Sequence, residues 1–307
     1  MYRIGIDVGG TFTDFTMIDE DQGIVHFHKV PSTPSDPSEA IATGIGQMLA
    51  SHGVAPSQVS HVGHGTTVAT NLIIERKGAR VGLITTQGFR DVLEIGRQTR
   101  PHLYDYSVGK PPVAVPREFR AEVGERVNAQ GEVLAPVDAD AVRGAARRFA
   151  AAGIDAVTIC FLHAYRNPAH EQQIKALVGR PAPELVACYS VEVLPEIREY
   201  ERTSTTVINA YVMPIVRRYL ATLRAGLDGV GVNTPLLIMQ SNGGLMTDGA
   251  AAAHPIHIIE SGPAAGVVGA QALARRIGLG KLITFDMGGT TAKASIVEDG
   301  EVSRAAE

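Results

Sequence analysis

The stretch Asp7-Val8-Gly9-Gly10-Thr11-Phe12-Thr13-Asp14 lies between two apolar runs, Ile4-Gly5-Ile6 and Phe15-Thr16-Met17-Ile18. This pattern predicts two strands joined by a glycine turn. The two glycines leave the bend without side chains, so backbone N–H groups can close on an anion. Threonine hydroxyls add hydrogen-bond donors, and the carboxylates of Asp7 and Asp14 suit a divalent cation. A plain hairpin turn is the alternative that this stretch alone leaves open.

A second copy of the pattern occurs near the other end of the sequence, where residues 282–297 align with the first copy without a gap. Asp7 aligns with Asp286, Gly9-Gly10 with Gly288-Gly289, and Thr11 with Thr290. The separation is too long for a solenoid repeat, so it indicates an internal duplication of half a molecule. Two such loops, one from each half, suit the two sides of one nucleotide's phosphates.

The composition excludes several classes of protein. The chain has 307 residues, 45% hydrophobic and 20% charged, with a net charge of −4. This is typical of a soluble globular protein with more than one domain, and it provides no bulk attraction to nucleic acid or an anionic membrane. Cys160 and Cys188 lie in apolar runs that predict buried strands, so we expect a reducing, cytoplasmic setting. The strand predicted at the N-terminus leaves no room for a signal peptide, and no run of about 18 apolar residues predicts a membrane span.

The remaining sequence alternates between strand and helix patterns, which favours parallel strands covered by helices. Strands are predicted over 24–30, 59–62, 80–85, 154–162, 184–189, 236–240 and 256–259, with a hairpin over 120–137. Helices are predicted over 37–53, 72–77, 138–153 and 170–178. The longest helix follows the polar run 197–206 and ends near Leu227. A further helix is predicted to have Ser261 as its N-cap and to open at Gly262-Pro263.

Other candidate site residues each have a structural alternative. His64 precedes a run of small and hydroxyl residues that leads into a helix, so it is a candidate acid, base or ligand contact. A structural histidine that satisfies loop carbonyls is the alternative. His26 and His28 share a strand face and could bind a metal, but exposed imidazoles explain them without a third ligand. Arg90, Arg97 and Arg100 could bind a carboxylate or phosphate, or be solvated surface charge.

Several long motifs, in order, resemble the hydantoinase A / 5-oxoprolinase family, which includes the acetone- and acetophenone-carboxylase nucleotide-binding subunits. Besides the two Asp-Gly-Gly-Thr loops, these motifs lie at 64–71, 75–79, 88–93, 199–203, 240–244 and 261–266. The resemblance covers essentially the whole chain. It implies an N-terminal region at 1–180 and the start of a hydantoinase A domain at 198–307.

The resemblance implies an α/β fold similar to the actin-like ATPases, with two duplicated ribonuclease-H-like domains and ATP and Mg²⁺ between them. By position, the phosphates would be bound by one set of residues, namely Gly9, Gly10, Thr11, Thr13, Gly288, Gly289, Thr290, Thr291 and Lys293. Asp7, Asp14 and Asp286 would hold the metal. Asp7, Asp286 and His64 would be the catalytic residues.

The chain departs from the family pattern after the second Gly-Gly-Thr. Many relatives carry Thr-Asp there, whereas this chain has Ala292-Lys293, so Lys293 is the counterpart of Asp14. The lysine could meet phosphate as a point charge or pair with Asp14 or Asp286. Relatives are also considerably longer, so we expect that this chain is an N-terminal portion of such a protein and that its second half is incomplete.

Three functions follow from the resemblance. The first is ATP-dependent hydrolysis of a cyclic amide, of the hydantoin or 5-oxoproline type, through phosphorylation of its carbonyl oxygen, with a hydantoinase B-type partner subunit. The second is the ATP-binding subunit of an acetone- or acetophenone-type carboxylase. The third is a nucleotide-binding fragment without activity. The sequence does not identify the substrate.

Overall fold

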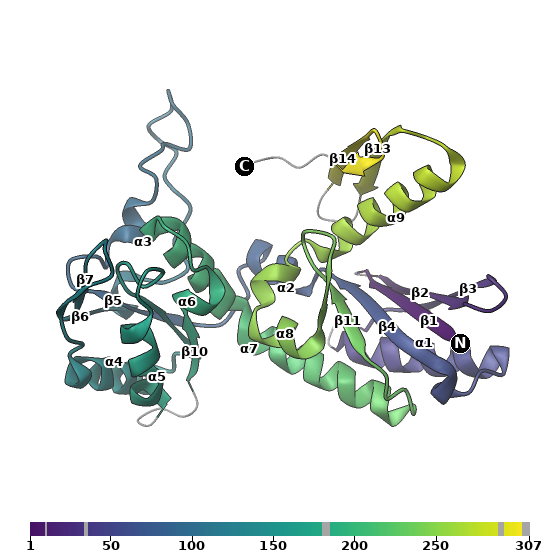
Figure 1. Cartoon of the computed structure of the whole chain (residues 1–307), viewed down its shortest axis with the longest axis horizontal. Helices are drawn as coiled ribbons and strands as arrows, with labels where there is room; N and C mark the ends of the chain where they lie inside the picture. The colour runs from purple at the N-terminus through teal and green to yellow at the C-terminus, as the bar shows by residue number, and fades with distance from the viewer. Residues whose placement is uncertain (10, 34–35, 180–184, 288–291, 303–307) are drawn as a thin grey trace. The chain divides into compact units, whose positions relative to one another are not determined.

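The structure, a computed structural model, describes residues 1–9, 11–33, 36–179, 185–287 and 292–302 (Figure 1). Its contacts divide the chain into two compact units. Unit 1 comprises Met1–Arg76 with Val216–Glu307, and unit 2 comprises Lys77–Ile215. The described part of each unit has its own β-sheet with helices packed against it, so the predicted α/β class is confirmed.

The described part of unit 1 contains a six-stranded mixed sheet in the order β12-β11-β4-β1-β2-β3. Strands β1, β2 and β3 form an antiparallel meander, and β4 lies parallel to β1 and β11. The strands are β1 (Tyr2–Val8), β2 (Phe12–Asp19), β3 (Val25–Pro31), β4 (Val59–Thr66), β11 (Leu236–Met239) and β12 (Leu245–Thr247). The predicted Asp-Gly-Gly-Thr hairpin is therefore confirmed as β1 and β2.

Strict alternation decides which face of the β1–β2 hairpin is buried. Ile4, Ile6 and Val8 lie on the core face with Phe15 and Met17, and Asp7 and Asp14 lie on the other. Helix α1 (Pro37–His52) packs against β2 and β3.

Helix α1 begins where the sequence predicts. Its first residue, Pro37, needs no N–H partner, and Asp36 caps it by accepting a hydrogen bond from the Ser38 backbone at 3.0 Å. The helix ends at Gly53, which adopts the left-handed conformation.

A second antiparallel hairpin in unit 1 has the register of the first. It consists of β13 (Lys281–Met287) and β14 (Ala292–Glu298), followed by the short β15 (Glu301–Val302). Lys281 pairs with Glu298 as Tyr2 pairs with Asp19. Asp286 pairs with Lys293 as Asp7 pairs with Asp14, so one constant offset relates both hairpins.

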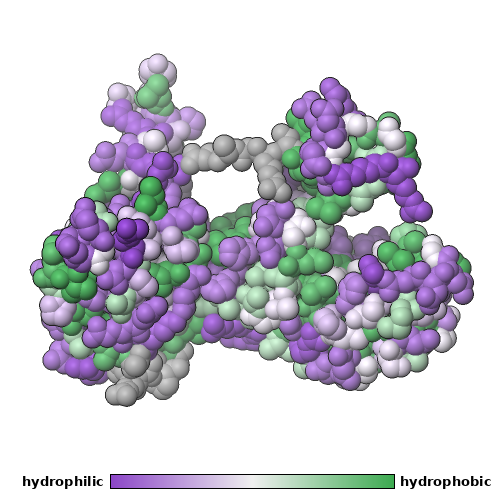
Figure 2. All heavy atoms as spheres, viewed as in Figure 1, coloured by the Kyte–Doolittle hydropathy of each residue, from purple (hydrophilic) through white to green (hydrophobic). Residues whose placement is uncertain are grey.

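The two hairpins differ in what covers their apolar face. Ile4 and Ile6 are 2% and 4% exposed, whereas their counterparts Ile283 and Phe285 are 72% and 66% exposed. Helix α9 (Ser261–Ile277) contacts β13, and Figure 2 shows hydrophobic and hydrophilic side chains intermixed over this part of unit 1. The second hairpin therefore presents to solvent the side-chain pattern that the first one buries.

Unit 2 is built on a parallel sheet in the order β10-β9-β5-β6. Its strands are β5 (Val81–Thr86), β6 (Arg120–Val123), β9 (Ala156–Cys160) and β10 (Val186–Tyr189). Every residue of β5 and β9 is buried, as expected for parallel strands covered on both faces. One face packs against α4 (Ala139–Ala151) and α5 (Ala169–Gly179), and the other against α7 (Glu199–Gly229).

The described residues include several shorter elements. These are α2 (Val68–Ile74), α3 (Val92–Ile95), α6 (Ser190–Val193), α8 (Asp248–Ala253), and the 3₁₀ turns η1 (Pro56–Gln58), η2 (Arg117–Phe119) and η3 (Pro255–Ile258). Cys160 and Cys188 are free thiols buried in β9 and β10, which confirms their predicted place in core strands. Within the described residues, no helix combines the length and apolarity that a membrane crossing requires.

Two local predictions are wrong, and a third is confirmed only in part. Within the predicted hairpin over 120–137, β7 (Arg126–Val127) and β8 (Val133–Ala135) pair antiparallel around the expected turn, whereas β6 pairs in parallel with β5. The segment predicted as a strand at 256–259 is instead the 3₁₀ turn η3, which begins at Pro255. An apolar run this short does not distinguish a strand from a helical turn. Ser261 is the first residue of α9 and not its N-cap, because Glu260 occupies that place with a positive φ of 65°.

Candidate functional site

The predicted phosphate loop places its two carboxylates on one face of unit 1. Asp7 and Asp14 are directly opposite each other across β1 and β2, on the face away from the core. Asp14 pairs with Lys29 of β3, whose Nζ lies 2.9 Å from Asp14 Oδ1. Asp14 is therefore partly neutralised, and Asp7 is the carboxylate at the turn without an ion-pair partner within the described residues.

A serine that the sequence analysis missed holds the turn. Ser32 Oγ donates to the Gly9 carbonyl at 2.7 Å and lies 3.0 Å from Thr13 Oγ1. Thr13 is fully buried on the core face, so its hydroxyl supports the turn from behind. Its predicted contact with phosphate has no support from this placement. Thr11 and Gly9 are exposed at the turn, and Gly10 lies outside the described residues.

The end of β4 and the start of α9 lie beside Asp7. In the parallel register Asp7 is opposite Gly65 of β4. A Cβ atom added at Gly262, in the first turn of α9, would lie 3.9 Å from Asp7 Oδ1. A Cβ atom at Gly65 would lie 3.6 Å from the Gly262 Cα atom, so glycine at both positions permits this close approach.

Side-chain hydrogen bonds fix this junction. Ser261 Oγ accepts from the Thr66 backbone N–H at 3.1 Å and donates to the Thr66 carbonyl at 2.9 Å. The Glu260 N–H donates to Thr70 Oγ1 of α2 at 2.8 Å. The N-terminal end of a long helix is thereby held next to the Asp7 turn, and such an end favours a bound anion.

The electrostatics of Asp7 are those of a crowded carboxylate. Its side chain reaches solvent, yet the surrounding protein reduces its hydration, and this raises its pKa above the usual value. The nearby charges of Asp14 and Asp286 raise the pKa further. A cation or a phosphate-bound metal at this position would relieve that repulsion.

The second loop differs from the first through Lys293. Lys293 is the cross-strand neighbour of Asp286, but its ammonium group forms an ion pair with Glu260 at the start of α9. Partial burial lowers its pKa. The predicted partners of Lys293 are Asp14, Asp286 or phosphate, and the pairing with Glu260 has no signal in the sequence. The predicted phosphate ligands Gly288, Gly289, Thr290 and Thr291 lie outside the described residues.

His64 is placed away from solvent. It is 1% exposed, and its Nε2 atom lies 2.6 Å from the Tyr219 hydroxyl on α7. Burial lowers the pKa of His64 to about 4, so the imidazole is neutral at physiological pH. This geometry favours the structural interpretation over contact with a substrate. His26 and His28 contact His52 and Gln47 of α1, respectively.

The described residues at the loop do not by themselves form a complete metal site. Among the described residues, no group of three His, Cys, Asp or Glu side chains lies close enough together to hold a metal ion. The predicted Asp7, Asp14 and Asp286 metal site stays a prediction. The first turn of α9 lies beside Asp7, since a Cβ atom added at Gly262 would be 3.9 Å from Asp7 Oδ1, and the N-terminus of a helix suits a phosphate.

The chain was compared with known proteins. The family model of the hydantoinase/oxoprolinase N-terminal region matches residues 3–180, and that of hydantoinase/oxoprolinase matches residues 202–307. The caprolactamase alpha subunit of Pseudomonas jessenii is 39% identical over 98% of this chain and 44% of its own length. The 5-oxoprolinase 1 of Arabidopsis thaliana is 32% identical over 95% of this chain and 25% of its own length.

Two solved structures are similar to this chain. The ATP-dependent caprolactamase from P. jessenii has a TM-score of 0.82 at 38% identity, covering 96% of this chain and 43% of that one. A nucleotide-free acetone carboxylase has a TM-score of 0.88 at 29% identity, covering 98% and 44%. The chain thus spans less than half the length of these relatives. With a family model matching more than half of its residues, the chain belongs to the hydantoinase/oxoprolinase family.

Proposed function

We propose that this chain is the phosphate-handling part of an ATP-dependent cyclic amide hydrolase. The observation that carries the proposal is the register-matched pair of hairpins, which places Asp7 and Asp286 at equivalent positions within one charged cluster. The relatives add that ATP-dependent hydrolysis of a lactam occurs in this family, since one is named an ATP-dependent caprolactamase.

We further propose that the two hairpins are the first strands of two duplicated, actin-like halves. Their constant offset and shared cross-strand pairs support this. The exposed apolar residues of β13 and β14 support it as well, because in the first hairpin the same positions form a core with helices. The second hairpin would bury them in the same way in the complete enzyme.

The proposed chemistry activates an amide that water alone opens very slowly. The amide oxygen attacks the γ-phosphorus of ATP, the bond to the β-phosphate oxygen breaks, and ADP leaves. Water then adds to the activated carbon, and the ring C–N bond breaks to release the amine and leave an acyl phosphate. A second water attacks the acyl carbon, phosphate leaves with the former amide oxygen, and a carboxylate remains. A bound Mg²⁺ would neutralise phosphate charge.

The chain's own residues supply position and charge in this scheme. The Asp-Gly-Gly-Thr turn and the backbone N–H groups at the start of α9 bind phosphate, and Asp7 and Asp286 orient the reacting groups. His64 contributes to structure and does not contact the reacting groups, because it joins β4 to α7 through its hydrogen bond with Tyr219. Because relatives include proteins named as subunits, we also propose a partner subunit of the hydantoinase B type.

An oxygen-transfer experiment tests the reaction. The purified protein, with any subunit that co-purifies, is given ATP and ε-caprolactam, 5-oxoproline or hydantoin, and ADP release is measured. With the accepted amide labelled by ¹⁸O at its carbonyl, we expect the label in inorganic phosphate. Label that stays in the carboxylate would refute the cleavage of the acyl C–O bond on which this scheme depends. ADP release only with a ketone and bicarbonate would assign the chain to the carboxylases, which the lower 29% identity does not favour.

A further inference from the structure

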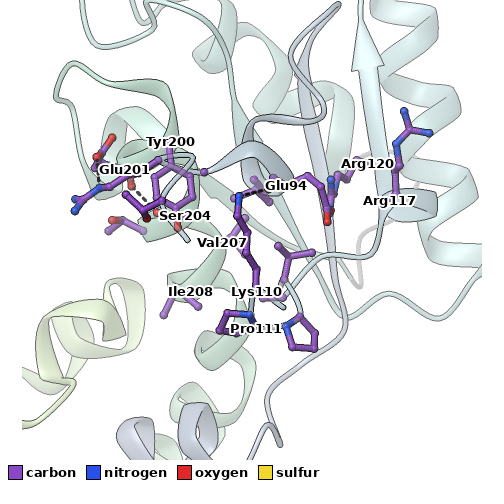
Figure 3. A pocket seen from close by; sticks show the side chains of 18 of the residues that line it. Glu94, Lys110, Pro111, Arg117, Arg120, Tyr200, Glu201, Ser204, Val207 and Ile208 are labelled. Carbon is purple, nitrogen blue, oxygen red and sulfur yellow. Dashed lines mark hydrogen bonds and ion pairs between the residues drawn. The ribbon is translucent and has the colours of Figure 1, made fainter. Parts of the chain in front are cut away.

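Unit 2 contains a pocket that the proposed reaction does not use. Its volume is about 1060 Å³, large enough for a small organic molecule. Residues of α3, of the loop between α3 and β6, and of the first turns of α7 line it (Figure 3). All of them belong to unit 2, so the pocket exists without any contribution from the phosphate loops.

The pocket has an excess of positive charge. Five basic side chains line it against two acidic ones, although the whole chain carries a net charge of −4. The basic residues are Arg97, Arg100, Lys110, Arg117 and Arg120, and the acidic ones are Glu94 and Glu201. Existing ion pairs satisfy part of this charge, because Arg97 pairs with Glu201 at 2.9 Å and Arg117 with Asp91 at 2.9 Å.

Two of the remaining cations have no carboxylate partner among the described residues. Lys110 Nζ donates to the Ile95 and Glu94 carbonyl oxygens, at 2.8 and 3.4 Å, which leaves its positive charge uncompensated. Arg100 stacks over the Tyr106 ring, with 4.5 Å between the guanidinium carbon and the ring centroid. In Figure 3, Lys110 lies between Tyr200 and Ser204 on one side and Arg120 on the other.

Arg120 adds a buried donor to the pocket wall. Its side chain is fully buried, its Nε donates to the Val115 carbonyl at 3.0 Å, and its Nη2 binds Glu94 at 2.9 Å. Its Nη1 has no hydrogen-bond partner, and Asp91 Oδ1 lies 3.8 Å away. A buried guanidinium N–H without an acceptor is costly, so an anionic acceptor here would be stabilised.

The rest of the lining is apolar. Leu93 and Val207 are buried members of the hydrophobic cluster between the sheet and α7, and Ile208 and Pro111 continue this surface into the pocket. A ligand that matches both parts needs a charged end and a hydrocarbon body.

We propose that this pocket binds a small organic anion, in which a carboxylate or phosphate group on an apolar body of several carbons meets Lys110, Arg100 and Arg120. A carboxylate is a planar oxyanion and a phosphate group is a tetrahedral one, and lysine and arginine bind either by charge-assisted hydrogen bonds. The site rests on unit 2 alone and does not depend on the function proposed for the phosphate loops.

A matched series of six-carbon probes tests the class of ligand. Hexanoate, hexyl phosphate, 1-hexanol and hexylamine are titrated into the purified protein by ligand-observed NMR. We expect at least one anion to bind saturably, and hexanol and hexylamine to bind at least about ten-fold more weakly, the factor expected for one charge-assisted hydrogen bond. Comparing the two anions identifies the headgroup.

Two variants locate the binding. Lys110→Met keeps the aliphatic chain and removes the charge, and we expect about ten-fold weaker anion binding with little change for hexanol. Arg147→Gln, an exposed change on α4 outside the pocket, is the control and should leave every affinity unchanged. Hexanol binding as tightly as both anions, the absence of saturable anion binding, or equal effects of the two variants would overturn the proposal.

Discussion

Lowering the pH from 7 to 4 should destabilise unit 1 through His64, and the size of the effect follows from its burial. Burial lowers the pKa of the folded imidazole from 6.5 to about 4. Between these two pKa values the imidazole is protonated in the unfolded chain and neutral in the folded chain, so the unfolding free energy decreases as the pH falls. One pKa unit corresponds to about 1.4 kcal/mol, and the whole shift to about 3 kcal/mol.

The variant His64→Gln isolates this contribution, because an amide can still bond to Tyr219 but does not titrate. Urea unfolding followed by circular dichroism gives the unfolding free energy of both proteins at each pH. We expect the advantage of the native protein over the variant to be constant above pH 6.5 and to shrink by about 3 kcal/mol by pH 4. A difference that stays flat over this interval would show that His64 is hydrated and free to act as an acid or base.

Three further predictions concern other buried or paired groups. Burial raises the pKa of Glu171 from 4.5 to about 7, so the folded protein holds a proton there that the unfolded chain releases. The unfolding free energy of unit 2 should therefore fall by about 3 kcal/mol as the pH rises from 4.5 to 7. In urea unfolding, Glu171→Gln should abolish this pH dependence. In α1, Gly44→Ala would place a Cβ atom 2.3 Å from the Phe15 ring and should lower the unfolding free energy by about 1–3 kcal/mol. The control Gly46→Ala meets only Val230, at 3.8 Å, and should not destabilise the helix. Equal changes in melting temperature for the two variants would refute this packing. Glu260→Gln removes the ion-pair partner of Lys293 and should change the Michaelis constant for ATP, while an unchanged constant would mean that Lys293 does not face the phosphates.

Much of unit 1 could be predicted because its pattern is local. The alternation in β1 and β2 and the repeat at Asp286 predict two hairpins, and the register confirms both. Pro37 and Gly53 delimit α1 as expected. Each of these sequence signals is adjacent to the strand or helix that it predicts. Contacts with distant residues therefore do not change the secondary structure at these positions.

The rest of the site depends on contacts between distant residues. Lys293 pairs with Glu260, Ser32 holds the Gly9 turn, and Ser261 joins β4 to α9. Each contact is set by how elements pack and leaves no periodic signal in the sequence. Thr13 shows the same limit, because its place in a plausible motif does not reveal that it faces the core.

Substrate-stimulated ADP release by Asp7→Asn measures the central claim most directly. Asp228→Asn, an exposed change near the end of α7, is the matched control, and circular dichroism establishes that both variants are folded. We predict that Asp7→Asn lowers turnover by about 100-fold or more, the range expected for a carboxylate at the reacting groups, while the control retains native activity. Turnover by Asp7→Asn equal to that of the control would contradict the assignment of this loop to phosphate chemistry.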